Sequence, residues 1–325
     1  MKIAHLILSK GYAGTERYVC DLANFQSKKN EVYIIKLKSD NTELFKKNTS
    51  NKIKIFEISN FLKTITLKKI IKNISPQIIH THLGTASRLL TKKWGDYKII
   101  TTMHMNYNKK YFKDVDGIIC SNNYQFQNIK KKFKGKVFKS FLWPVEKLKT
   151  NGINMKKKLG LTKDTYVFGS IGRFHKQKGF DFLAKTFDKI NLRKTVLILV
   201  GNDHVELAKK YQHNKNIICL GHVDCPSDLY QVFNAAVFAS RWESFGITLL
   251  EAMLHKLPII STVHEGNKDW INKFNIKRIR VDEETDLKKS FISFRKLTPK
   301  KIKYNLKDFN YKTICGNIEN FYKQL

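Results

Sequence analysis

The sequence predicts two α/β domains, each built on a parallel β-sheet that helices cover on both faces. Short apolar runs rich in β-branched residues alternate with segments of helical length along the whole chain. These runs are continuous rather than alternating, and Gly, Asn or Asp bounds them, which is typical of strands buried on both faces. One interruption divides the runs into two series, and 325 residues suffice for a core in each of two domains.

Each half of the chain contains six predicted strands. Those of the first half cover residues 3–8, 32–37, 53–58, 78–82, 99–104 and 117–121. Those of the second half cover residues 166–171, 195–200, 217–220, 236–239, 258–262 and 276–281. Trp143-Pro144 and a Lys/Asn/Gly stretch interrupt the pattern. We predict an N-terminal domain over 1–143, a linker over 144–158, a C-terminal domain over 159–310, and a final helix over 311–325 that could cross back to the N-terminal domain.

The chain is strongly basic, with 61 Lys and Arg residues against 27 Asp and Glu residues and a net charge of +34. Only eight of the basic residues are arginine. This ratio disfavours sequence-specific DNA binding, since bidentate base contacts favour arginine. Codon usage that favours Lys, Asn and Ile explains part of the excess. The remainder indicates attraction to phosphates, acidic lipids or nucleic acid.

The cysteines fit neither a disulfide framework nor a zinc site. There are five of them, widely spread and without a C-x-x-C pair: Cys20, Cys120, Cys219, Cys225 and Cys315. This usage indicates a reducing compartment. The apolar run over 3–8 is too short for a signal peptide, and no run approaches the roughly 20 apolar residues of a membrane span. We therefore expect a cytoplasmic protein, free or peripheral on a membrane.

The segment over 240–253, SRWESFGITLLEAM, places one glutamate before a predicted helix and one within it. A strand leads into a turn at Gly246, and the helix begins near Ile247. The exposed N–H groups of such a turn form an anion site. In one continuous helix Glu243 and Glu251 would lie about 12 Å apart, too far for the carboxylate pair of a glycosidase at about 5 to 9.5 Å. They could instead contact two parts of one ligand, such as a sugar and a ribose.

A second polar segment, GRFHKQKGFD over 172–181, follows the predicted strand over 166–171. Gly172 comes directly after the strand, and Arg173 and Lys178 lie five residues apart before a helix. This arrangement predicts a cationic phosphate clamp on a backbone turn. In a protein rich in lysine, Arg173 is the more specific signal.

Together these segments resemble the retaining glycosyltransferases of family 4. The resemblance rests on Gly172-Arg173 with Lys178-Gly179 and on the E-x7-E spacing of Glu243 and Glu251. It extends over nearly the whole chain, through GTER at 14–17, PQIIHTHLG at 76–84, NGIN at 151–154 and LPII at 257–260. It implies the GT-B fold: two Rossmann-like domains with a cleft between them, nucleotide-sugar in the C-terminal domain and acceptor mainly in the N-terminal one.

The resemblance also implies roles for individual residues. Arg173 and Lys178 would hold the donor diphosphate, Glu243 would contact the transferred sugar, and Glu251 would bind the ribose. Further donor contacts would come from Gly14, Thr15, Gly172, Ser244 and the backbone N–H groups of Phe245, Gly246 and Ile247. His104, at the end of a predicted strand, matches the histidine that the family places near the donor sugar. His82, at the neighbouring strand end, is a weaker acceptor candidate.

Three places depart from the family pattern. Ala13-Gly14 stands where two glycines are usual, Ala239 where proline is common, and the loop over 264–267 lacks the usual double glycine. Asp114-Val115-Asp116 is a D-x-D, the metal signature of the other glycosyltransferase fold, but here the strand follows the motif instead of preceding it. We read it as a turn and expect neither a metal nor a cofactor.

The N-terminal half is the more basic, with a net charge of +19 over residues 1–143. Two of its segments combine lysines with apolar or aromatic residues. Lys68, Lys69 and Lys72 accompany Phe61 and Ile65 in the first, and Tyr107 and Tyr111 interleave with lysines in the second. Such surfaces suit an anionic bilayer, although a packed helix with a solvated lysine face would look the same.

Three functions remain open from the sequence. The first is a metal-independent retaining hexosyltransferase that uses a nucleotide-sugar and a membrane-associated acceptor, in lipopolysaccharide or surface-polysaccharide biosynthesis at the inner face of the cytoplasmic membrane. The second is a nucleotide-sugar 2-epimerase on the same fold, which needs no acceptor and which the E-x7-E segment disfavours. The third is a basic nucleic-acid-binding protein with salt-dependent binding. No recognised motif supports it, so no specific nucleic-acid partner is expected.

Overall fold

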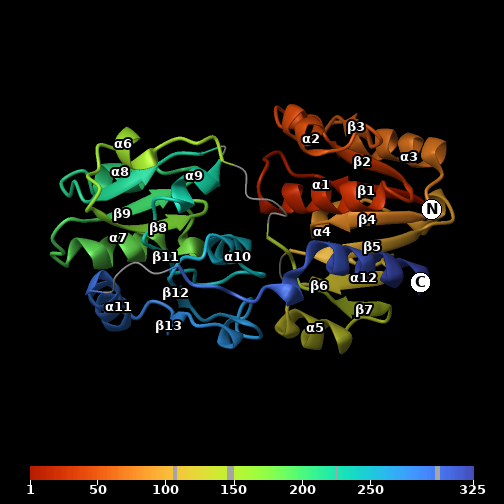
Figure 1. Cartoon of the computed structure of the whole chain (residues 1–325). Helices are drawn as coiled ribbons and strands as arrows, with labels where there is room; N and C mark the ends of the chain where they lie inside the picture. The colour runs from red at the N-terminus through yellow and green to blue at the C-terminus, as the bar shows by residue number, and fades with distance from the viewer. Residues whose placement is uncertain (105–107, 145–149, 224, 297–300) are drawn as a thin grey trace. The chain divides into compact units, whose positions relative to one another are not determined.

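The computed structural model describes residues 1–104, 108–144, 150–223, 225–296 and 301–325, which form two compact units (Figure 1). The N-terminal unit comprises Met1–Leu142 and Asp308–Leu325, and the C-terminal unit comprises Trp143–Lys307. Each unit is built on one parallel sheet. The predicted fold class of two doubly wound α/β domains is therefore confirmed.

The N-terminal unit contains a seven-stranded sheet in the order β3-β2-β1-β4-β5-β6-β7. All neighbouring strands pair in parallel. The strands are β1 (Lys2–Ile7), β2 (Glu31–Leu37), β3 (Lys54–Ile58), β4 (Ile78–His82), β5 (Lys98–Met103), β6 (Gly117–Cys120) and β7 (Lys136–Lys139). The order of the strands reverses between β1 and β4, so the loops after these two strands lie next to each other at the carboxyl edge.

The helices of this unit cover both faces of the sheet. They are α1 (Gly14–Gln26), α2 (Thr42–Asn48), α3 (Lys63–Ile74), α4 (Gly84–Ser87), α5 (Asn123–Lys130) and α12 (Tyr311–Lys323), with short 3₁₀ turns over Lys92–Trp94 and Lys109–Tyr111. Leu67 and Ile71 of α3 and Ile129 of α5 join Leu6, Ile35 and Ile79 in one apolar core. Helices α1 and α12 pack together on the opposite face.

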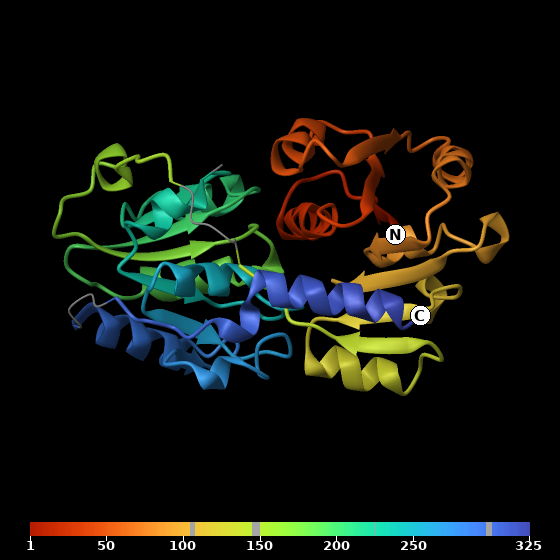
Figure 2. The same cartoon turned by 45° about the vertical axis from the view of Figure 1, so that its right-hand side comes forward.

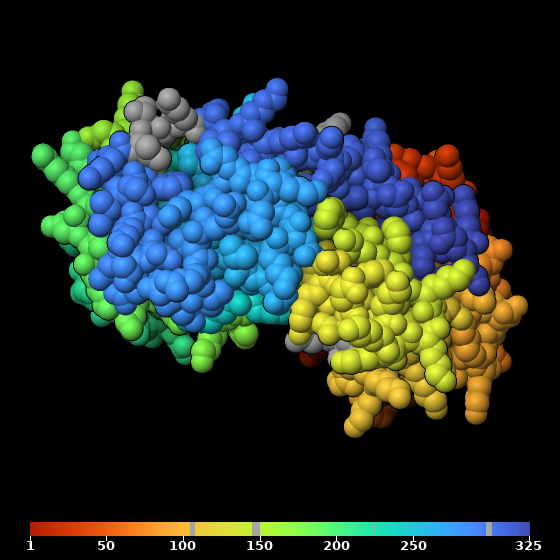
Figure 3. All heavy atoms as spheres, turned by 90° about the horizontal axis from the view of Figure 1, so that it is seen from below, coloured from red at the N-terminus to blue at the C-terminus, as the bar shows by residue number. Residues whose placement is uncertain are grey.

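The last helix, α12, is part of the N-terminal unit although it follows the whole C-terminal unit in sequence (Figure 2). The hydroxyl of Tyr311 donates to the carbonyl oxygen of Asp21, at 2.6 Å. The ring of Phe321 stacks on that of Phe138, with centroids 5.1 Å apart. Figure 3 shows this C-terminal segment in blue against the yellow segment of α5 and β7. Both chain termini are thus held in one domain.

The C-terminal unit contains a six-stranded sheet in the order β10-β9-β8-β11-β12-β13, also parallel throughout. Its strands are β8 (Tyr166–Ile171), β9 (Thr195–Val200), β10 (Ile217–Leu220), β11 (Ala235–Phe238), β12 (Ile259–Thr262) and β13 (Lys277–Ile279). Its helices are α6 (Met155–Lys158), α7 (Phe180–Asp188), α8 (Val205–Lys210), α9 (Pro226–Tyr230), α10 (Ile247–Leu254) and α11 (Glu284–Lys296). Phe182 and Phe187 of α7 and Phe291 of α11 pack on this sheet.

Twelve strands lie where the sequence predicts them, to within two residues at most ends, but β7 was missed. Its sequence is KVFK, and the burial of its residues is only partial. Because β7 is the edge strand, it needs no long apolar run, and the apolar-run criterion does not detect it. The linker predicted over 144–158 includes α6, and its residues 145–149 lie outside the described part of the chain.

Three buried histidines and the half-buried His104 lie together beneath α1 and α12. His5, His80 and His82 are 0% exposed, and the ring of His104 lies 6.0 Å from that of His82. Burial lowers the pKa of His5 and of His104 to about 4. It lowers the pKa of His80 and of His82 well below the usual value, and the neighbouring imidazoles add to this shift. All four are therefore neutral in the folded protein near pH 7.

Acidification from pH 7 to pH 5 should destabilise the fold, because unfolding allows these histidines to bind protons. Stability from a lowered histidine pKa is complete above 6.5 and is lost as the pH falls toward about 4. Each such residue then costs up to about 1.4 kcal/mol per pH unit within this window. Urea unfolding at pH 7, 6 and 5 measures the loss.

The variant His5→Gln should flatten this pH dependence, whereas His175→Gln, at an exposed position, should leave it unchanged. A wild-type slope in His5→Gln would contradict the assignment.

Candidate active site

The candidate site of the C-terminal unit lies where its strand order reverses, between β8 and β11. In open α/β sheets, ligands bind beyond the carboxyl ends of the strands at such a point. The loop over 172–179 follows β8, and the loop over 239–246 follows β11. The loop over 263–267 follows the adjacent strand β12. The first two of these loops carry most of the residues that the sequence predicts to contact the donor.

In the loop after β8, the aliphatic part of the Lys178 side chain packs on Gly172. A Cβ atom on Gly172 would lie 3.3 Å from Cδ of Lys178. Gly179 has a φ of 68°, and a Cβ atom there would lie only 2.1 Å from the carbonyl oxygen of Ala239 in the neighbouring loop. Only glycine fits this contact. Arg173 is exposed and is therefore accessible to a ligand.

Lys178 and Glu243 form an ion pair between the two loops. Their side chains are 18% and 12% exposed, so the pair is largely withdrawn from water. The hydroxyl of Ser240 donates to the same Glu243 oxygen at 3.0 Å. Two residues that are 65 positions apart in the sequence, and that were predicted to contact one ligand, thus touch each other.

Helix α10 begins directly after this loop with a bare N-terminus. Gly246 has a φ of 97° and is the cap residue of α10, without a side chain that could accept the first N–H groups. The side chain of Phe245 is fully buried, with its ring 5.4 Å from that of Trp270. Phe245 can therefore offer a ligand only its backbone, and the adjacent Ser244 and Ile247 are half-buried.

Glu251 lies in the second turn of α10, whereas Glu243 precedes the helix. The hydroxyl of Tyr230 donates to the carbonyl oxygen of Thr248 at 3.1 Å and lies 3.5 Å from Oε2 of Glu251. The two glutamates of the E-x7-E segment thus belong to two different elements, the loop after β11 and the helix.

The loop after β12 adds His264, which the sequence analysis did not select. A Cβ atom on Gly266 would lie 2.1 Å from the carbonyl oxygen of Glu243, so this loop touches the Glu243 loop. Burial, opposed by the charge of Glu243, lowers the pKa of His264 to about 4. The sequence showed that residues 264–267 depart from the family pattern, but this gave no reason to select the histidine.

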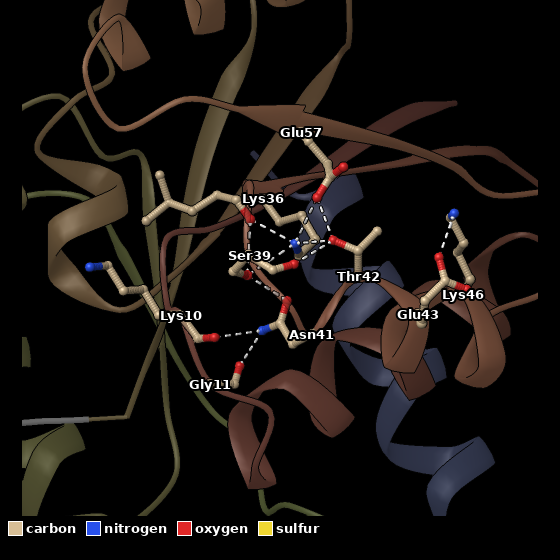
Figure 4. Close-up of polar contacts among 10 residues, drawn as sticks. Lys10, Gly11, Lys36, Ser39, Asn41, Thr42, Glu43, Lys46 and Glu57 are labelled. Atoms are coloured by element: carbon tan, nitrogen blue, oxygen red, sulfur yellow. Dashed lines mark hydrogen bonds and ion pairs between the residues drawn. The ribbon is translucent and has the colours of Figure 1, made fainter.

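In the N-terminal unit, the loop after β1 is held from both sides. The carboxylate of Glu16 accepts hydrogen bonds from the hydroxyl of Ser9 and from the N–H of Ala13, the latter at 2.7 Å. The side-chain amide of Asn41 donates to the carbonyl oxygens of Lys10 and Gly11 (Figure 4). Gly14 and Thr15, the predicted donor contacts, follow this loop as the first residues of α1.

A buried lysine fixes the segment that carries Asn41. Lys36, at 0% exposure, donates to the carbonyl oxygen of Leu37 at 2.6 Å and to the hydroxyl of Thr42 at 2.9 Å, and it pairs with Glu57 at 3.3 Å (Figure 4). The Thr42 hydroxyl and Lys36 lower the pKa of Glu57. Because these bonds join the end of β2 to Thr42 at the start of α2 and to Glu57 of β3, this ammonium has a structural role.

His82 is the last residue of β4, and His104 directly follows β5. In the described structure, each has a ring nitrogen without a hydrogen-bond partner. The other nitrogen of His82, Nε2, lies 3.1 Å from Nδ1 of His5. Nδ1 of His82 and Nε2 of His104 are buried without a hydrogen-bond partner in the described structure. Unsatisfied buried nitrogens are uncommon and mark positions where a polar group can bind.

One cluster in the described residues brings three potential metal ligands within 4.8 Å of one another, namely His5, His80 and His82. Most of their ring nitrogens already have partners. Nε2 of His5 contacts Gln26, and the two nitrogens of His80 contact Thr102 and Tyr322, at 2.6 to 2.7 Å. The cluster is therefore a hydrogen-bonded network in the core.

The D-x-D segment also has a structural role. The carboxylate of Asp116 accepts a hydrogen bond from the N–H of Ile99 at 2.7 Å and pairs with Lys92. Asp116, which directly precedes β6, thereby joins the start of β5 to the 3₁₀ turn before that strand.

The second predicted membrane segment is only partly visible, since Tyr107 lies outside the described residues. Tyr111 packs on Gly84, where a Cβ atom would lie 2.7 Å from its ring, and on Arg88, whose guanidinium lies 5.9 Å from the ring centre. This tyrosine is half-buried, and its predicted acceptor or membrane role stays a prediction.

Two family models match the chain, one in each unit. The model "Glycosyl transferase 4-like" matches residues 9–139, and "Glycosyl transferases group 1" matches residues 153–307. The uncharacterized glycosyltransferase MJ1059 of Methanocaldococcus jannaschii is 29% identical over 238 residues, which are 62% of this chain and 59% of that protein. The chain thus spans about three fifths of the length of this curated relative, and similarly 63% of a 41.2 kDa protein from the cps region of Klebsiella pneumoniae.

Other similarities extend over most of the chain. The O-antigen biosynthesis glycosyltransferase WclY of Escherichia coli is 22% identical over 285 residues, which are 81% of this chain and 80% of that protein. The crystal structure of Anabaena Alr3699/HepE in complex with UDP-glucose has a TM-score of 0.86 over 100% of both chains, at 16% identity. At this identity the likeness shows the fold.

The fold and the family models together define the class of protein. Each of the two parallel-sheet domains matches one glycosyltransferase family model, and the fold of the whole chain is the GT-B fold. The assignment rests on matches in both domains and does not depend on any one relative.

The variant Gly179→Ala should destabilise the C-terminal unit much more than Gly160→Ala. Both glycines have a positive φ, 68° and 65°, but a Cβ atom meets the Ala239 carbonyl in the first and open space in the second. The conformational cost, about 1 to 2 kcal/mol, is common to both variants. Only Gly179→Ala adds a backbone clash, so its urea midpoint should fall further. Equal midpoints would show that the two loops do not meet as described.

Proposed function

We propose that the chain is a retaining, metal-independent glycosyltransferase. It transfers a hexose-type unit from a nucleotide-sugar to a lipid-linked or lipopolysaccharide-type acceptor at the inner face of the cytoplasmic membrane. The observation that carries the proposal is the Lys178–Glu243 ion pair at the strand-order reversal of the C-terminal unit. A cationic loop, a carboxylate and a bare helix N-terminus meet there, which is the chemistry that a nucleotide diphosphate and a sugar require.

The diphosphate would compete with Glu243 for Lys178. Before the donor binds, the ammonium is neutralised by the carboxylate. When the diphosphate binds, it takes over the ammonium and contacts Arg173, and the first N–H groups of α10 add further donors. Negative charge grows on the diphosphate as the sugar leaves, so these donors stabilise the transition state more than the ground state.

Once the diphosphate has displaced it from Lys178, Glu243 would be free to contact the hydroxyl groups of the sugar. Glu251, on α10, would bind the ribose. His104 would contribute its unpartnered Nε2 near the transferred sugar. Because His104 is neutral near pH 7, this nitrogen can accept or donate one hydrogen bond without adding charge. No protein nucleophile is required in this mechanism.

The relatives support the nature of donor and acceptor. HepE was crystallised with UDP-glucose, and WclY is named for O-antigen biosynthesis. By similarity we propose a nucleoside-diphosphate sugar as donor and a surface-glycan precursor as acceptor.

The variants Arg173→Ala and Lys178→Ala should each lower transfer by about 100-fold, because the leaving diphosphate loses a cationic partner. Thermal shift with UDP-, GDP- and ADP-sugars first identifies the donor, since a ligand at 100 times its Kd stabilises by about 2.7 kcal/mol. Transfer is then measured with that donor.

Lys176→Ala is the matched control, because Lys176 lies in the same loop with an exposed side chain. It should transfer at nearly the wild-type rate. Wild-type turnover in both Arg173→Ala and Lys178→Ala would refute the diphosphate assignment, and inversion of the anomeric configuration in the product would refute retention.

The two glutamates should separate kinetically. Glu243→Gln should mainly lower kcat, because this residue acts at the reacting sugar. Glu251→Gln should raise the Kd of the free nucleoside diphosphate about tenfold, the loss of one charge-assisted hydrogen bond. Calorimetry with the nucleotide and steady-state kinetics measure the two effects, and EDTA should change neither. An unaltered nucleotide Kd in Glu251→Gln would rule out the ribose role.

Helix α3 presents the surface that fits an anionic membrane. Phe61, Leu62 and Ile65 at its start are 91%, 49% and 69% exposed. Leu67, Ile71 and Ile74 are buried in the unit, and the lysines at 68, 69 and 72 are exposed. We call Phe61, Leu62, Ile65 and these three lysines the α3 patch. Among the described residues, no helix is long and apolar enough to cross a bilayer.

Reversing the charge of Lys68, Lys69 and Lys72 together to Glu should abolish co-sedimentation with anionic liposomes and spare transfer to a soluble acceptor analogue. Wild-type binding should weaken as salt rises, since the Debye length falls from about 10 Å at 0.1 M to about 3 Å at 1 M.

Reversal of Lys130, Lys131 and Lys132, which are exposed at the end of α5, is the control for net charge and should retain more binding. Equal binding to neutral and anionic liposomes would refute the proposed binding of the α3 patch to an anionic membrane.

A further inference from the structure

Arg241 contacts three separate segments of the C-terminal unit. Its guanidinium donates to both carboxylate oxygens of Asp181 on α7, each at 2.9 Å. Its Nε donates to Asp282 at 2.8 Å, and the same side chain donates to the carbonyl oxygen of Lys176. The pKa of Arg241 is raised by these carboxylates, Asp181 first. One side chain thus joins the segment after β13 and the segment before α7 to the loop after β11.

The backbone beside Arg241 is bound to the same loop. The N–H of Arg241 donates to the carbonyl oxygen of Gln177, and the side-chain amide of Gln177 donates to the carbonyl oxygen of Trp242, both at 2.8 Å. These bonds hold residues 176–177 against residues 241–242. Lys178 and Glu243 are the next residue in each of these segments.

We propose that Arg241 is a positioning residue for the Lys178–Glu243 pair, an inference that rests on the proposed function. The donor must separate these two side chains while their backbones stay at the spacing that fits a diphosphate and a sugar. The ion pair cannot maintain this spacing, because it is lost when the donor binds. The bonds of Arg241 involve neither charged group of the pair, so they persist in the complex.

Arginine is required for this role, because its planar guanidinium binds Asp181 through two parallel hydrogen bonds and still reaches Asp282. A lysine ammonium is a point charge and does not impose the same direction. Asp181 and Asp282 are also 52% and 46% exposed, and exposed pairs contribute little to stability. Loss of Arg241 should therefore alter the placement of the two loops more than the stability of the fold.

The test uses the full chain with Arg241→Lys and Arg241→Met. Arg280→Lys is the control, since this arginine pairs with Glu283 and Asp286 in the same unit at 78% exposure. Both Arg241 variants should lose about tenfold or more in kcat, with the midpoint of thermal unfolding within about 2 °C of wild type. The Kd for UDP alone should change less than threefold, because UDP lacks the sugar that Glu243 contacts. Arg280→Lys should behave as wild type.

Hydrogen exchange without any ligand provides a readout independent of activity. Amides over 172–179 and 240–246 should exchange faster in Arg241→Met and in Asp181→Asn, which removes the bidentate partner and keeps the arginine. Wild-type kcat in Arg241→Met, full rescue by Arg241→Lys, or unchanged exchange in both loops would overturn the proposal. If wild type shows no transfer with any nucleotide-sugar, the proposed function fails, and the exchange result still decides whether Arg241 fixes the loops.

Discussion

All strands in both sheets run parallel, and this constraint organises the rest of the structure. Parallel neighbours end at the same edge, so loops that are far apart in sequence meet where the order of the strands reverses. In the C-terminal unit the reversal between β8 and β11 brings Lys178 to Glu243. In the N-terminal unit the reversal between β1 and β4 brings the loop over 8–13 near the end of the strand that carries His82.

Close backbone contact at this edge depends on a few glycines. A side chain at Gly179 or Gly266 would collide with the carbonyl oxygen of a neighbouring loop, and one at Gly201 would lie 1.8 Å from the carbonyl oxygen of Gly172. The loops are therefore packed backbone against backbone, and Arg241 with Gln177 adds hydrogen bonds across the same contact. Such a scaffold leaves the charged side chains as the parts that can move when a ligand binds.

The N-terminal unit contains polar groups that would be costly to bury without partners. Lys36 is fully buried and uses its ammonium to fix the turn after β2. His80 is bonded on both ring nitrogens, to Thr102 and to Tyr322 of α12. The last helix of the chain thereby completes a network in the core of the first domain, which is why α12 belongs to that domain even though the C-terminal unit precedes it in sequence.

The sequence by itself determined the fold class, because continuous apolar runs at regular spacing can be buried only in parallel sheets with helices on both faces. It also placed Arg173, Lys178 and Glu243 at strand-to-helix junctions and Glu251 within the helix that follows, since these junctions can be read from the local pattern. Only the tertiary structure decided which of these residues touch. The Lys178–Glu243 pair, the burial of His264 and the bonds of Arg241 all join segments that lie 20 to 90 residues apart. The edge strand β7 was missed because its sequence, KVFK, contains no long apolar run. The burial of Lys36 was not expected because a lysine in the sequence usually indicates solvent, and only its packed neighbours show that it is covered.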